Sequence, residues 1–509
     1  MRRSVSFYIT VLLLFGGGIL GLLHVGSRLE TGRAGAPPGA AGAPSVAAAR
    51  HDAAAPPPSS PRDAAPAGVA GALRENLHHP LSILLLQVIV IVAAARVAGA
   101  LFARIGQPRV IGEMVAGIVL GPSLLGALAP AAQGFLFPAH SMDALRLLSQ
   151  IGVVLFMFVV GIDLDVRHLR QKADAAVLVS HASILVPFFL GTAGALLVYP
   201  TLAPAGTPFS AFALFMGVAM SITAFPVLAR IIEERGLAGT QLGTTAIACA
   251  AVGDVTAWCL LPVVVAIADA QRLAGSLLTI GLTLLFIAGM LFVVRPAIAR
   301  FVARRPVKTG GSTAVLAGAL TFVFAAALAT EVIGIHARFG AFLAGVAMPA
   351  DSALRQVLRE RLETFSSVFL LPLFFAFTGL RTEIGLLDDA RSWLVCAGVV
   401  ALAIAGKLGG SMAAARWTGM SWGDSFALGA LMNTRGLVEL IVLNLGYDLG
   451  ILSPSIFTML VVMALLTTFM TGPLLALQAW WQRRAVAAAA PKLGLTVPAP
   501  AGRTPPGRA

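Results

Sequence analysis

The strongest constraint on this chain is a succession of apolar segments, each about 20 residues long, that begins at Pro80 and continues to about residue 479. A helix of about 20 residues crosses a hydrocarbon layer of about 30 Å. Apolar residues make up 58% of the sequence and charged residues only 12%. In soluble domains apolar residues make up about 45 to 50% and charged residues about 25%. The chain is therefore predicted to be an all-α polytopic membrane protein.

The basic residues are placed as in a protein that spans a membrane. The net charge is +13, but Lys and Arg lie in short alternate loops and form no basic face for nucleic acid. Loops rich in Lys and Arg stay in the cytoplasm, so the loops that hold Arg104, Arg235, Arg304 and Arg416 are predicted to be cytoplasmic, and the C-terminus with them. A bacterial inner membrane suits this pattern. About 13 spans are predicted, namely 80–104, 109–128, 145–163, 175–199, 208–232, 242–268, 273–294, 312–332, 333–349, 365–385, 392–416, 424–447 and 453–479.

The two ends of the chain differ in composition from this membrane domain. Arg2 and Arg3 precede an apolar stretch, and this pattern fits a cleaved signal peptide and a signal anchor equally well. An Ala, Pro and Gly-rich stretch follows, with too few bulky apolar residues to fold, so it is predicted to be a disordered external linker. The predicted units are the signal segment 1–27, the linker 28–78, the membrane domain 79–480 and a short disordered cytoplasmic tail 481–509.

Two short blocks recur in the same order in the two halves of the membrane domain. IGEMVAGIVLGP (111–122) resembles FGAFLAGVAMP (339–349), and LFMFVVGIDLDV (155–166) resembles LFFAFTGLRTEI (373–384). An odd number of spans separates the copies, so they must insert with opposite orientations. Inverted repeats are typical of secondary transporters, whose binding site lies between the repeats near the middle of the membrane.

Two later spans hold residues that interrupt a helix, in corresponding places of the two halves: SITAFPVLAR (221–230) and MNTRGLVELI (432–441). Proline cannot donate a backbone hydrogen bond and glycine adopts many conformations, so both helices are predicted to break. Broken helices expose partial charges that can bind an ion. The predicted breaks lie at Phe225, Pro226, Arg435 and Gly436, and the predicted oxygen ligands are Ser221, Thr223, Asn433 and Thr434.

Charged residues inside the spans are the best candidates for a transport function. Asp254 is the only charged residue of the span 242–268, and a carboxylate inside a membrane indicates function by default. It is predicted to bind a proton or a cation in turn. Lys407 lies deep in another span, where it can pair with Asp254 or neutralise the broken helices, although snorkelling to the interface is the alternative. Arg435 and Glu439 have the spacing of a helical ion pair, in either a structural or a functional role.

Several segments of the sequence resemble the monovalent cation:proton antiporter-2 family, which includes Kef-type and sodium:proton exchanger-like membrane domains. They are QPRVIGEMVAGIVLGPSLLG (107–126), SITAFPVLARIIEERGL (221–237), AVGDVTAW (251–258), GIHARFGAFLAGVAMP (334–349), LPLFFAFTGLRTEIGLL (371–387) and LGALMNTRGLVELIVLNLGYDLGILSP (428–454). The resemblance implies a fold of 13 helices with two crossed discontinuous helices, a homodimer, and alternating access by movement of a core. It also places the ion-binding aspartate on Asp254 and the core lysine on Lys407.

The sequence departs from the family at Gly253, where many relatives carry an acid or asparagine, and this favours electroneutral exchange of one proton for one cation. The predicted function is antiport of Na⁺ or K⁺ against protons, with no cofactor, resident metal or nucleic acid. A gated cation channel or uniporter and a membrane sensor that does not transport are the alternatives. An enzyme is not expected, because no HExxH, GxSxG or Cys/His constellation is found.

Overall fold

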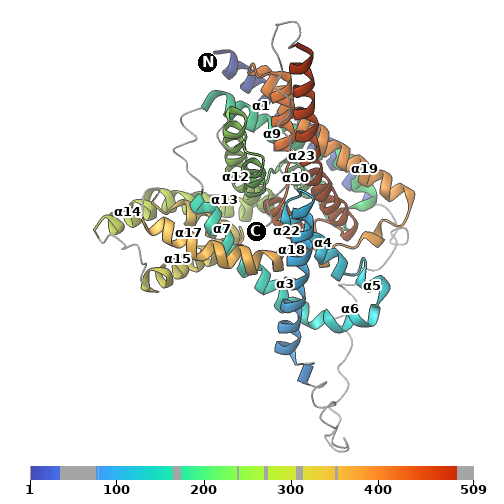
Figure 1. The fold of residues 1–509 in the computed structure, drawn as a ribbon, viewed down its shortest axis with the longest axis vertical. Helices are drawn as coiled ribbons and strands as arrows, with labels where there is room; N and C mark the ends of the chain where they lie inside the picture. Colours follow the sequence, from blue (N-terminus) through green and yellow to red (C-terminus); the bar gives the residue numbers. More distant parts are fainter. Residues whose placement is uncertain are drawn as a thin grey trace, which may run out of the picture.

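The computed structural model describes residues 2–34, 76–77, 79–163, 173–237, 240–268, 273–304, 313–349 and 353–489, and within these ranges every regular element is a helix (Figure 1). Nine helical stretches of the described residues are long and apolar enough to cross a membrane. The helices of the first half are α1 (Arg2–Ala34), α3 (Pro80–Arg104), α4 (Arg109–Leu120), α5 (Leu125–Leu128), α6 (Pro130–Leu136), α7 (Met142–Asp163), α9 (Ala173–Leu202), α10 (Phe209–Ser221), α11 (Phe225–Glu234), α12 (Gln241–Ala268) and α13 (Leu273–Ala288).

Those of the second half are α14 (Arg295–Arg304), α15 (Thr313–Ile333), α16 (Ala337–Val346), α17 (Ala353–Phe365), α18 (Leu371–Leu380), α19 (Ala390–Ile404), α20 (Gly410–Trp417), α21 (Trp422–Met432), α22 (Leu437–Asp448) and α23 (Pro454–Ala489). Three π-helical segments, η2 (Gly289–Val294), η3 (Ser366–Leu370) and η5 (Ala405–Gly409), join neighbouring helices end to end. Each predicted span overlaps one helix or consecutive helices.

Most of the long helices fall into two sets by their contacts. One set, here called the scaffold helices, comprises α3, α4, α7, α15, α16 and α18, which pack mainly on one another. The other set, the core helices, comprises α9, α10, α11, α12, α19, α20, α21, α22 and α23. Few contacts join the sets, among them α18 with α22 and α4 with α23. The core helices bring both interrupted helices together.

Close glycine contacts show the inverted repeat within the scaffold helices. A Cβ on Gly117 of α4 would lie 2.1 Å from the Ala376 carbonyl oxygen on α18, and a Cβ on Gly345 of α16 would lie 2.2 Å from that of Phe158 on α7. Gly117 and Gly345 occupy the same place in the two repeated blocks. The first block of each repeat therefore packs against the second block of the other, and only glycine permits backbones this close.

The chain ends extend as helices beyond the boundaries predicted from sequence. Helix α1 continues to Ala34, past residue 27, and α23 continues to Ala489, past residue 480. Alanine is the best helix former, and the run AVAAA at the end of α23 explains its extension. The rest of the predicted linker and tail, residues 35–75, 78 and 490–509, lies outside the described residues.

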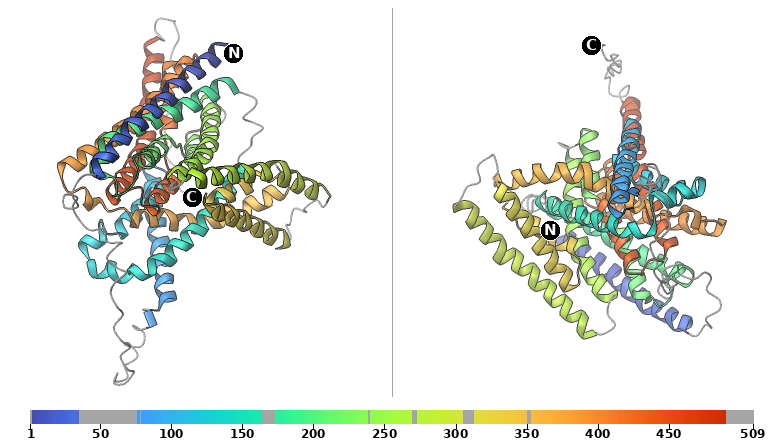
Figure 2. Two further views of the ribbon diagram at one scale, coloured as in Figure 1. Left: turned by 180° about the vertical axis from the view of Figure 1, so that it is seen from behind. Right: turned by 90° about the horizontal axis from the view of Figure 1, so that it is seen from below.

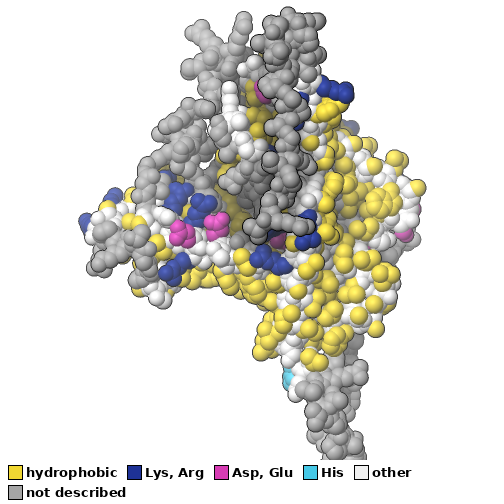
Figure 3. All heavy atoms as spheres, viewed as in Figure 1, with side chains coloured by type: hydrophobic (Ala, Val, Ile, Leu, Met, Phe, Trp, Pro, Cys, Tyr) yellow, Lys and Arg dark blue, Asp and Glu magenta, His cyan; other side chains and the backbone are white. Residues whose placement is uncertain are grey.

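The molecular surface suits a bilayer. Large apolar side chains are exposed along α3, among them Leu81, Leu85, Ile89 and Val97. Figure 3 shows a broad hydrophobic area on one side of the molecule and basic side chains gathered where Figure 1 places α14 and α17. At a polar edge, the side chain of Asp389 caps α19 by accepting from the Ser392 backbone N–H at 2.7 Å. Hydrogen bonding from the Ser392 side chain and backbone lowers the pKa of this exposed carboxyl.

Candidate functional site

The two discontinuous helices are interrupted at the residues that the sequence indicated. Helix α10 ends at Ser221 and α11 begins at Phe225, so residues 222–224 form an extended link. Helix α21 ends at Met432 and α22 begins at Leu437. Pro226 is the second residue of α11, in the first turn, where its missing N–H is tolerated. Each interruption therefore places the C-terminal end of one half-helix and the N-terminal end of the next half-helix inside the bundle.

Backbone hydrogen bonds tie the two interruptions to each other. The Ala224 N–H donates to the Thr434 carbonyl at 3.0 Å, and the Thr223 hydroxyl donates to the Met432 carbonyl at 3.0 Å. A Cβ on Gly436 would lie 2.9 Å from Val227 Cγ2, tighter than ordinary contact, so glycine lets the two links approach. The interruptions therefore cross at one point, deep among buried residues.

Arg435 fills the space between the crossing and α10. Its Nη1 donates to the Ala219 carbonyl at 2.7 Å and its Nη2 to the Met220 carbonyl at 2.8 Å, both in the last turn of α10. Nη1 also pairs with Glu439 Oε1 at 3.0 Å, and both side chains are 0% exposed. The end of a helix carries partial negative charge, so Arg435 neutralises the end of α10 as well as Glu439. The ion pair that the spacing predicted is present within the second discontinuous helix, and the hydrogen bonds from Arg435 to α10 join this helix to the first.

Threonines of α23 form hydrogen bonds with the residues of the second interruption. The Thr468 hydroxyl accepts from the Arg435 N–H at 2.9 Å and donates to the Arg435 carbonyl at 2.8 Å. The Thr471 hydroxyl lies 3.4 Å from that of Thr434. Neither threonine was predicted from the sequence. The cluster LLTTFMT was the available signal, because three threonines so close together are unusual in an otherwise apolar span.

The predicted oxygen ligands differ in how fully they are already used. The Ser221 hydroxyl donates to the Val218 carbonyl at 2.9 Å, and, like that of Thr223, its oxygen keeps acceptor capacity. Asn433 is 0% exposed, and among the described residues neither its amide oxygen nor its amide nitrogen has a hydrogen-bond partner. A buried amide without partners is costly. Of the predicted oxygen ligands at the crossing, Asn433 is therefore the one whose amide oxygen is available to coordinate a cation.

Lys407 lies among the core helices and not at the interface. It is 1% exposed, and its Nζ donates to the Ser183 carbonyl on α9 at 2.9 Å. Lys407 sits in the π-helical segment η5, and such segments are often found at functional sites. Ser183 is a second contact that the sequence did not indicate.

Asp254 belongs to α12, which packs against α9, α10, α11 and α21. The helix of the predicted ion-binding aspartate thus contacts both halves of the first discontinuous helix and one half of the second. The side chain of Asp254 lies outside the described part of the structure. Gly253, beside it, is buried, and no atom of the described residues lies within 4 Å of a Cβ added there.

A second polar cluster joins the scaffold helices to the core helices at one end of α22. Arg381, after α18, pairs with Asp448 of α22 at 2.6 Å and donates to Asn444 Oδ1 at 3.0 Å. Its guanidinium also lies over the rings of Phe377 and Tyr447, 5.1 and 4.6 Å from the centroids. This cluster is the best-defined polar contact between the two sets in the described residues.

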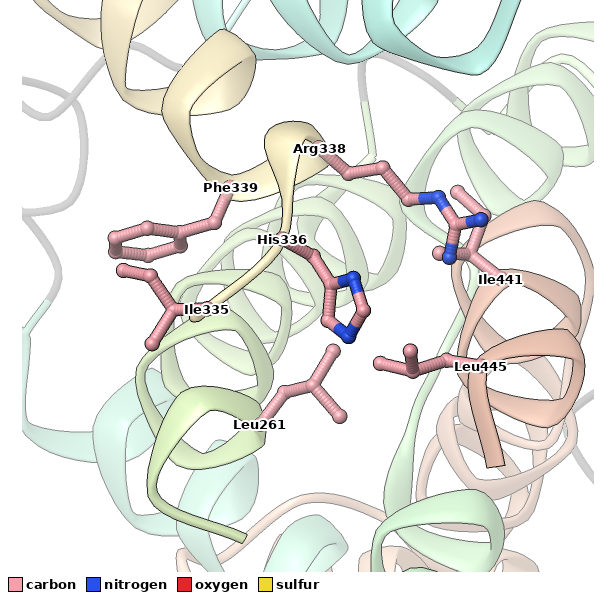
Figure 4. Close-up of a pocket in the computed structure, with 7 residues that line it drawn as sticks. All are labelled: Leu261, Ile335, His336, Arg338, Phe339, Ile441 and Leu445. Atoms are coloured by element: carbon pink, nitrogen blue, oxygen red, sulfur yellow. The ribbon is translucent and has the colours of Figure 1, made fainter. Parts of the chain in front are cut away.

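A small pocket opens beside this cluster, between α12, α16 and α22 (Figure 4). His336, Leu261 and Leu445 converge on it, and the guanidinium of Arg338 lies beside Ile441 of α22. Within the described residues Arg338 Nη1 has no hydrogen-bond partner. No group of three metal-ligating side chains occurs among the residues that the structure describes.

Comparison with known proteins places the chain in a well-populated group. A family model described as sodium/hydrogen exchanger, transmembrane, matches residues 89–481. The Na⁺/H⁺ antiporter NhaS4 of Synechocystis sp. is 46% identical over 399 residues, which cover 77% of this chain and 96% of that protein. The cation/H⁺ antiporter 20 of Arabidopsis thaliana is 41% identical, with 78% of this chain and 48% of that protein covered.

A K⁺/H⁺ antiporter of Saccharomyces cerevisiae is 32% identical, with 78% of this chain and 46% of that protein covered. The chain thus spans nearly all of the cyanobacterial relative but only about half the length of the plant and yeast relatives. Among solved structures, the sodium proton antiporter MjNhaP1 of Methanocaldococcus jannaschii at pH 8 has a TM-score of 0.56 at 13% identity, covering 79% of this chain and 97% of that one. At that identity the likeness concerns the fold.

Proposed function

Because this chain belongs to the sodium/hydrogen exchanger family of transmembrane proteins, we propose that it exchanges a monovalent cation, Na⁺ or K⁺, for protons by alternating access. The family is one of antiporters and not of enzymes. The observation that carries the proposal is the crossing of two discontinuous helices against α12, the helix of Asp254. The names of the relatives include both Na⁺ and K⁺, so either ion is a candidate for this protein.

In the proposed mechanism Asp254 holds a proton or a cation, but not both. A cation that reaches the crossing meets the carboxylate of Asp254 together with oxygens of Thr223, Ser221, Thr434 and Asn433. Lys407 supplies positive charge nearby when no cation is bound. Oxygen ligands suit hard monovalent cations, and unwound carbonyls at half-helix ends serve the same purpose in carriers. Competition for one carboxylate couples the two fluxes, and no cofactor is needed.

The direct test is purified protein in proteoliposomes with a trapped pH dye, challenged with NaCl, KCl or choline chloride. Addition of Na⁺ or K⁺ outside should move protons outward, and choline should not. Cation flux without proton movement would instead identify a channel or uniporter. If neither cation flux nor proton movement occurs, the protein would be a membrane sensor that does not transport. We further propose a homodimer in a bacterial inner membrane, with the C-terminus in the cytoplasm.

Asn433 offers a test of the binding site that separates affinity from stability. Asn433→Leu removes an amide without hydrogen-bond partners among the described residues, so the melting temperature should stay the same or rise, while the cation concentration for half-maximal proton movement should increase about 10-fold, equivalent to about 1.4 kcal/mol. Thermal unfolding in detergent and a cation titration in proteoliposomes measure the two effects.

The matched control is Asn444→Leu, a second buried asparagine of the same discontinuous helix. Its amide donates to the Thr378 hydroxyl and to the Leu440 carbonyl, both at 2.9 Å, so this variant should lower the melting temperature. If Asn433→Leu lowered the melting temperature as much and left the titration unchanged, Asn433 would be structural and not a ligand.

The Arg381–Asp448 ion pair should hold the two sets of helices together in the present conformation. Alternating access requires contacts at one end of the site to break while those at the other form. The two side chains are 16% and 20% exposed, and loss of such a partly buried pair is worth about 1 to 2 kcal/mol, or a factor of about 5 to 30 in an equilibrium. Arg381→Gln should therefore favour the conformation in which this end is open.

Labelling of a cysteine at Leu445, in a protein whose Cys249, Cys259 and Cys396 are replaced by alanine, measures this shift. The rate with an impermeant thiol reagent should rise about 5- to 30-fold in the Arg381→Gln background, and the exchanged pair Arg381→Asp with Asp448→Arg should restore the slow rate. Equal rates in all three backgrounds would show that the ion pair does not control access.

A further inference from the structure

Helix α1 lies outside the part of the chain that the family model matches, which begins at residue 89. It nevertheless packs along the core helices, chiefly on α9 and also on α10. Figure 2, seen from behind, shows α1 on the outer surface of the group of helices that contains α9. A segment outside the family domain is not required for that fold, so its contacts with the core helices indicate a role of its own.

One face of α1 is shaped to fit α9 and α10. The ring of Phe15 meets that of Phe189 edge to face, with 5.4 Å between centroids. Ile19 and Leu23 pack against the same buried cluster as α9 and α10. Positions 15, 19 and 23 share one face of a helix, whereas Leu13, Leu14 and Leu20 on other faces are more than 60% exposed.

Two glycines lie where that face comes closest to its partners. A Cβ on Gly18 would lie 2.7 Å from the ring of Phe189, and a Cβ on Gly26 would lie 1.9 Å from the ring of Phe209. Gly17 and Gly21, on the same helix, have no atom of the described residues within 4 Å of an added Cβ. The small residues of the docked face are therefore needed for the fit.

Glu30 fixes the far end of α1 at the beginning of α10. Its carboxylate accepts a hydrogen bond from the backbone N–H of Phe209, the first residue of α10. The first N–H groups of a helix lack partners within the helix and attract negative charge. Glu30 therefore satisfies one of these N–H groups and completes a start that Pro208 and the side chains of α10 leave uncapped.

The length and direction of α1 match a membrane crossing. From Arg3 to Glu30 the helix rises about 40 Å at about 1.5 Å per residue, close to the about 40 to 45 Å of a bilayer with its headgroup regions. Glu30 lies beside the turn between α9 and α10, and Phe15 lies beside the middle of α9. Helix α1 thus runs parallel to α9, from the predicted cytoplasmic side outward, as an uncleaved anchor would.

We propose that α1 is retained in the mature protein as an additional membrane-spanning helix, docked on α9 and α10, and that it travels with the core helices during transport. The first half of this proposal stands on the contacts alone, and the second half rests on the proposed alternating access. Helix α3, the next long helix among the described residues, belongs to the scaffold helices. Residues 35–79 therefore connect a helix of the core to a helix of the scaffold.

The docking is tested by a disulfide between Gly26→Cys and Phe209→Cys, in full-length protein without Cys249, Cys259 and Cys396 and with a protease site inserted between residues 35 and 75. An added Cβ at residue 26 lies 2.2 Å from Phe209 Cδ1, so the two Cβ atoms fall near the spacing of a disulfide. After oxidation and proteolysis, we expect the two fragments to stay joined until reduced. Gly21→Cys with Phe209→Cys, the matched control, should separate.

Removal of α1 during maturation would overturn the first half, and intact mass of the C-terminally tagged protein would reveal it. As a second measurement, Gly26→Val should lower the melting temperature by about 2 to 4 °C, and Gly21→Val should leave it unchanged. If Gly26→Val fails to fold, the disulfide pair still decides the question.

Movement with the core is tested by transport in the cross-linked protein. If α1 travels with α10, the oxidised Gly26→Cys, Phe209→Cys protein should exchange ions within about 2-fold of its reduced form. Arrest on oxidation that reduction reverses would overturn this half of the proposal. This experiment requires that the reduced protein exchanges ions. If the proposed antiport function is wrong, exchange will instead be absent in the oxidised protein, the reduced protein and the wild type.

Discussion

Asp254→Asn is expected to abolish cation-dependent proton movement while the protein remains folded. Asparagine has nearly the same shape as aspartate but cannot take up and release a proton at this carboxyl position, and it has no charge to offer a cation. The exchange rate should therefore fall at least about 100-fold, to the level of liposomes without protein, a loss of about 2.7 kcal/mol or more in the barrier. The trapped pH dye, with Na⁺ and K⁺ added in turn, measures it.

The control for Asp254→Asn is Asp388→Asn, the same chemical change at an exposed carboxylate between α18 and α19. This variant should exchange ions at the wild-type rate. Proton movement that persists in Asp254→Asn would show that another group carries the proton. Loss of movement in both variants would point to a general effect of removing negative charge.

Arg435→Ala is expected to destabilise the protein more than any other single substitution at the crossing. Removal of the guanidinium leaves the Glu439 carboxylate buried without its counter-ion and takes donors from the Ala219 and Met220 carbonyls. Breaking a buried ion pair by removing one partner costs about 3 to 5 kcal/mol. The melting temperature in detergent, followed by tryptophan fluorescence, should fall by many degrees, with reduced yield of monodisperse protein.

The chain supplies a matched control on α17. Arg359 and Glu363 form an ion pair at 3.2 Å with the same spacing of four residues, but their side chains are 52% and 46% exposed. Exposed pairs of this kind contribute about 0.3 to 0.5 kcal/mol, so Arg359→Ala should hardly change the melting temperature. Replacing both Arg435 and Glu439 by methionine and leucine should cost less than Arg435→Ala alone, because no charge is then left buried. Equal melting temperatures for Arg435→Ala and Arg359→Ala would contradict the structural assignment.

Much of the fold could be predicted from sequence because membrane helices satisfy their own backbone hydrogen bonds. Hydropathy alone therefore indicates where they lie. The interruptions near Pro226 and Gly436 were also visible, since both residue types act on the local backbone. The spacing of Arg435 and Glu439 predicted their ion pair, because neighbours on one helix turn are encoded locally.

Contacts between distant segments could not be predicted in this way. The donation from Arg435 to the last turn of α10, the bracing by Thr468 and the bond from Lys407 to the Ser183 carbonyl all depend on which helices become neighbours. No periodicity carries that information. The docking of α1 is the clearest example, because a cleaved signal and a retained anchor have the same composition, and only contacts with α9 and α10, such as that of Gly26 with Phe209, favour one of them.

The glycine contacts of the repeat also constrain how the protein is made. Gly117 on α4 packs on Ala376 of α18, and Phe158 on α7 packs on Gly345 of α16, so each early helix lacks its partner until the second repeat is synthesised. At a synthesis rate of about 5 to 20 residues per second, α18 emerges some tens of seconds after α4. During that interval the surface of α4 around Gly117 and the surface of α7 around Phe158 contact lipid or an insertion factor in place of α18 and α16. Assembly is therefore completed late, when the second repeat closes on the first, and chains stopped before α16 should be substrates for membrane quality control.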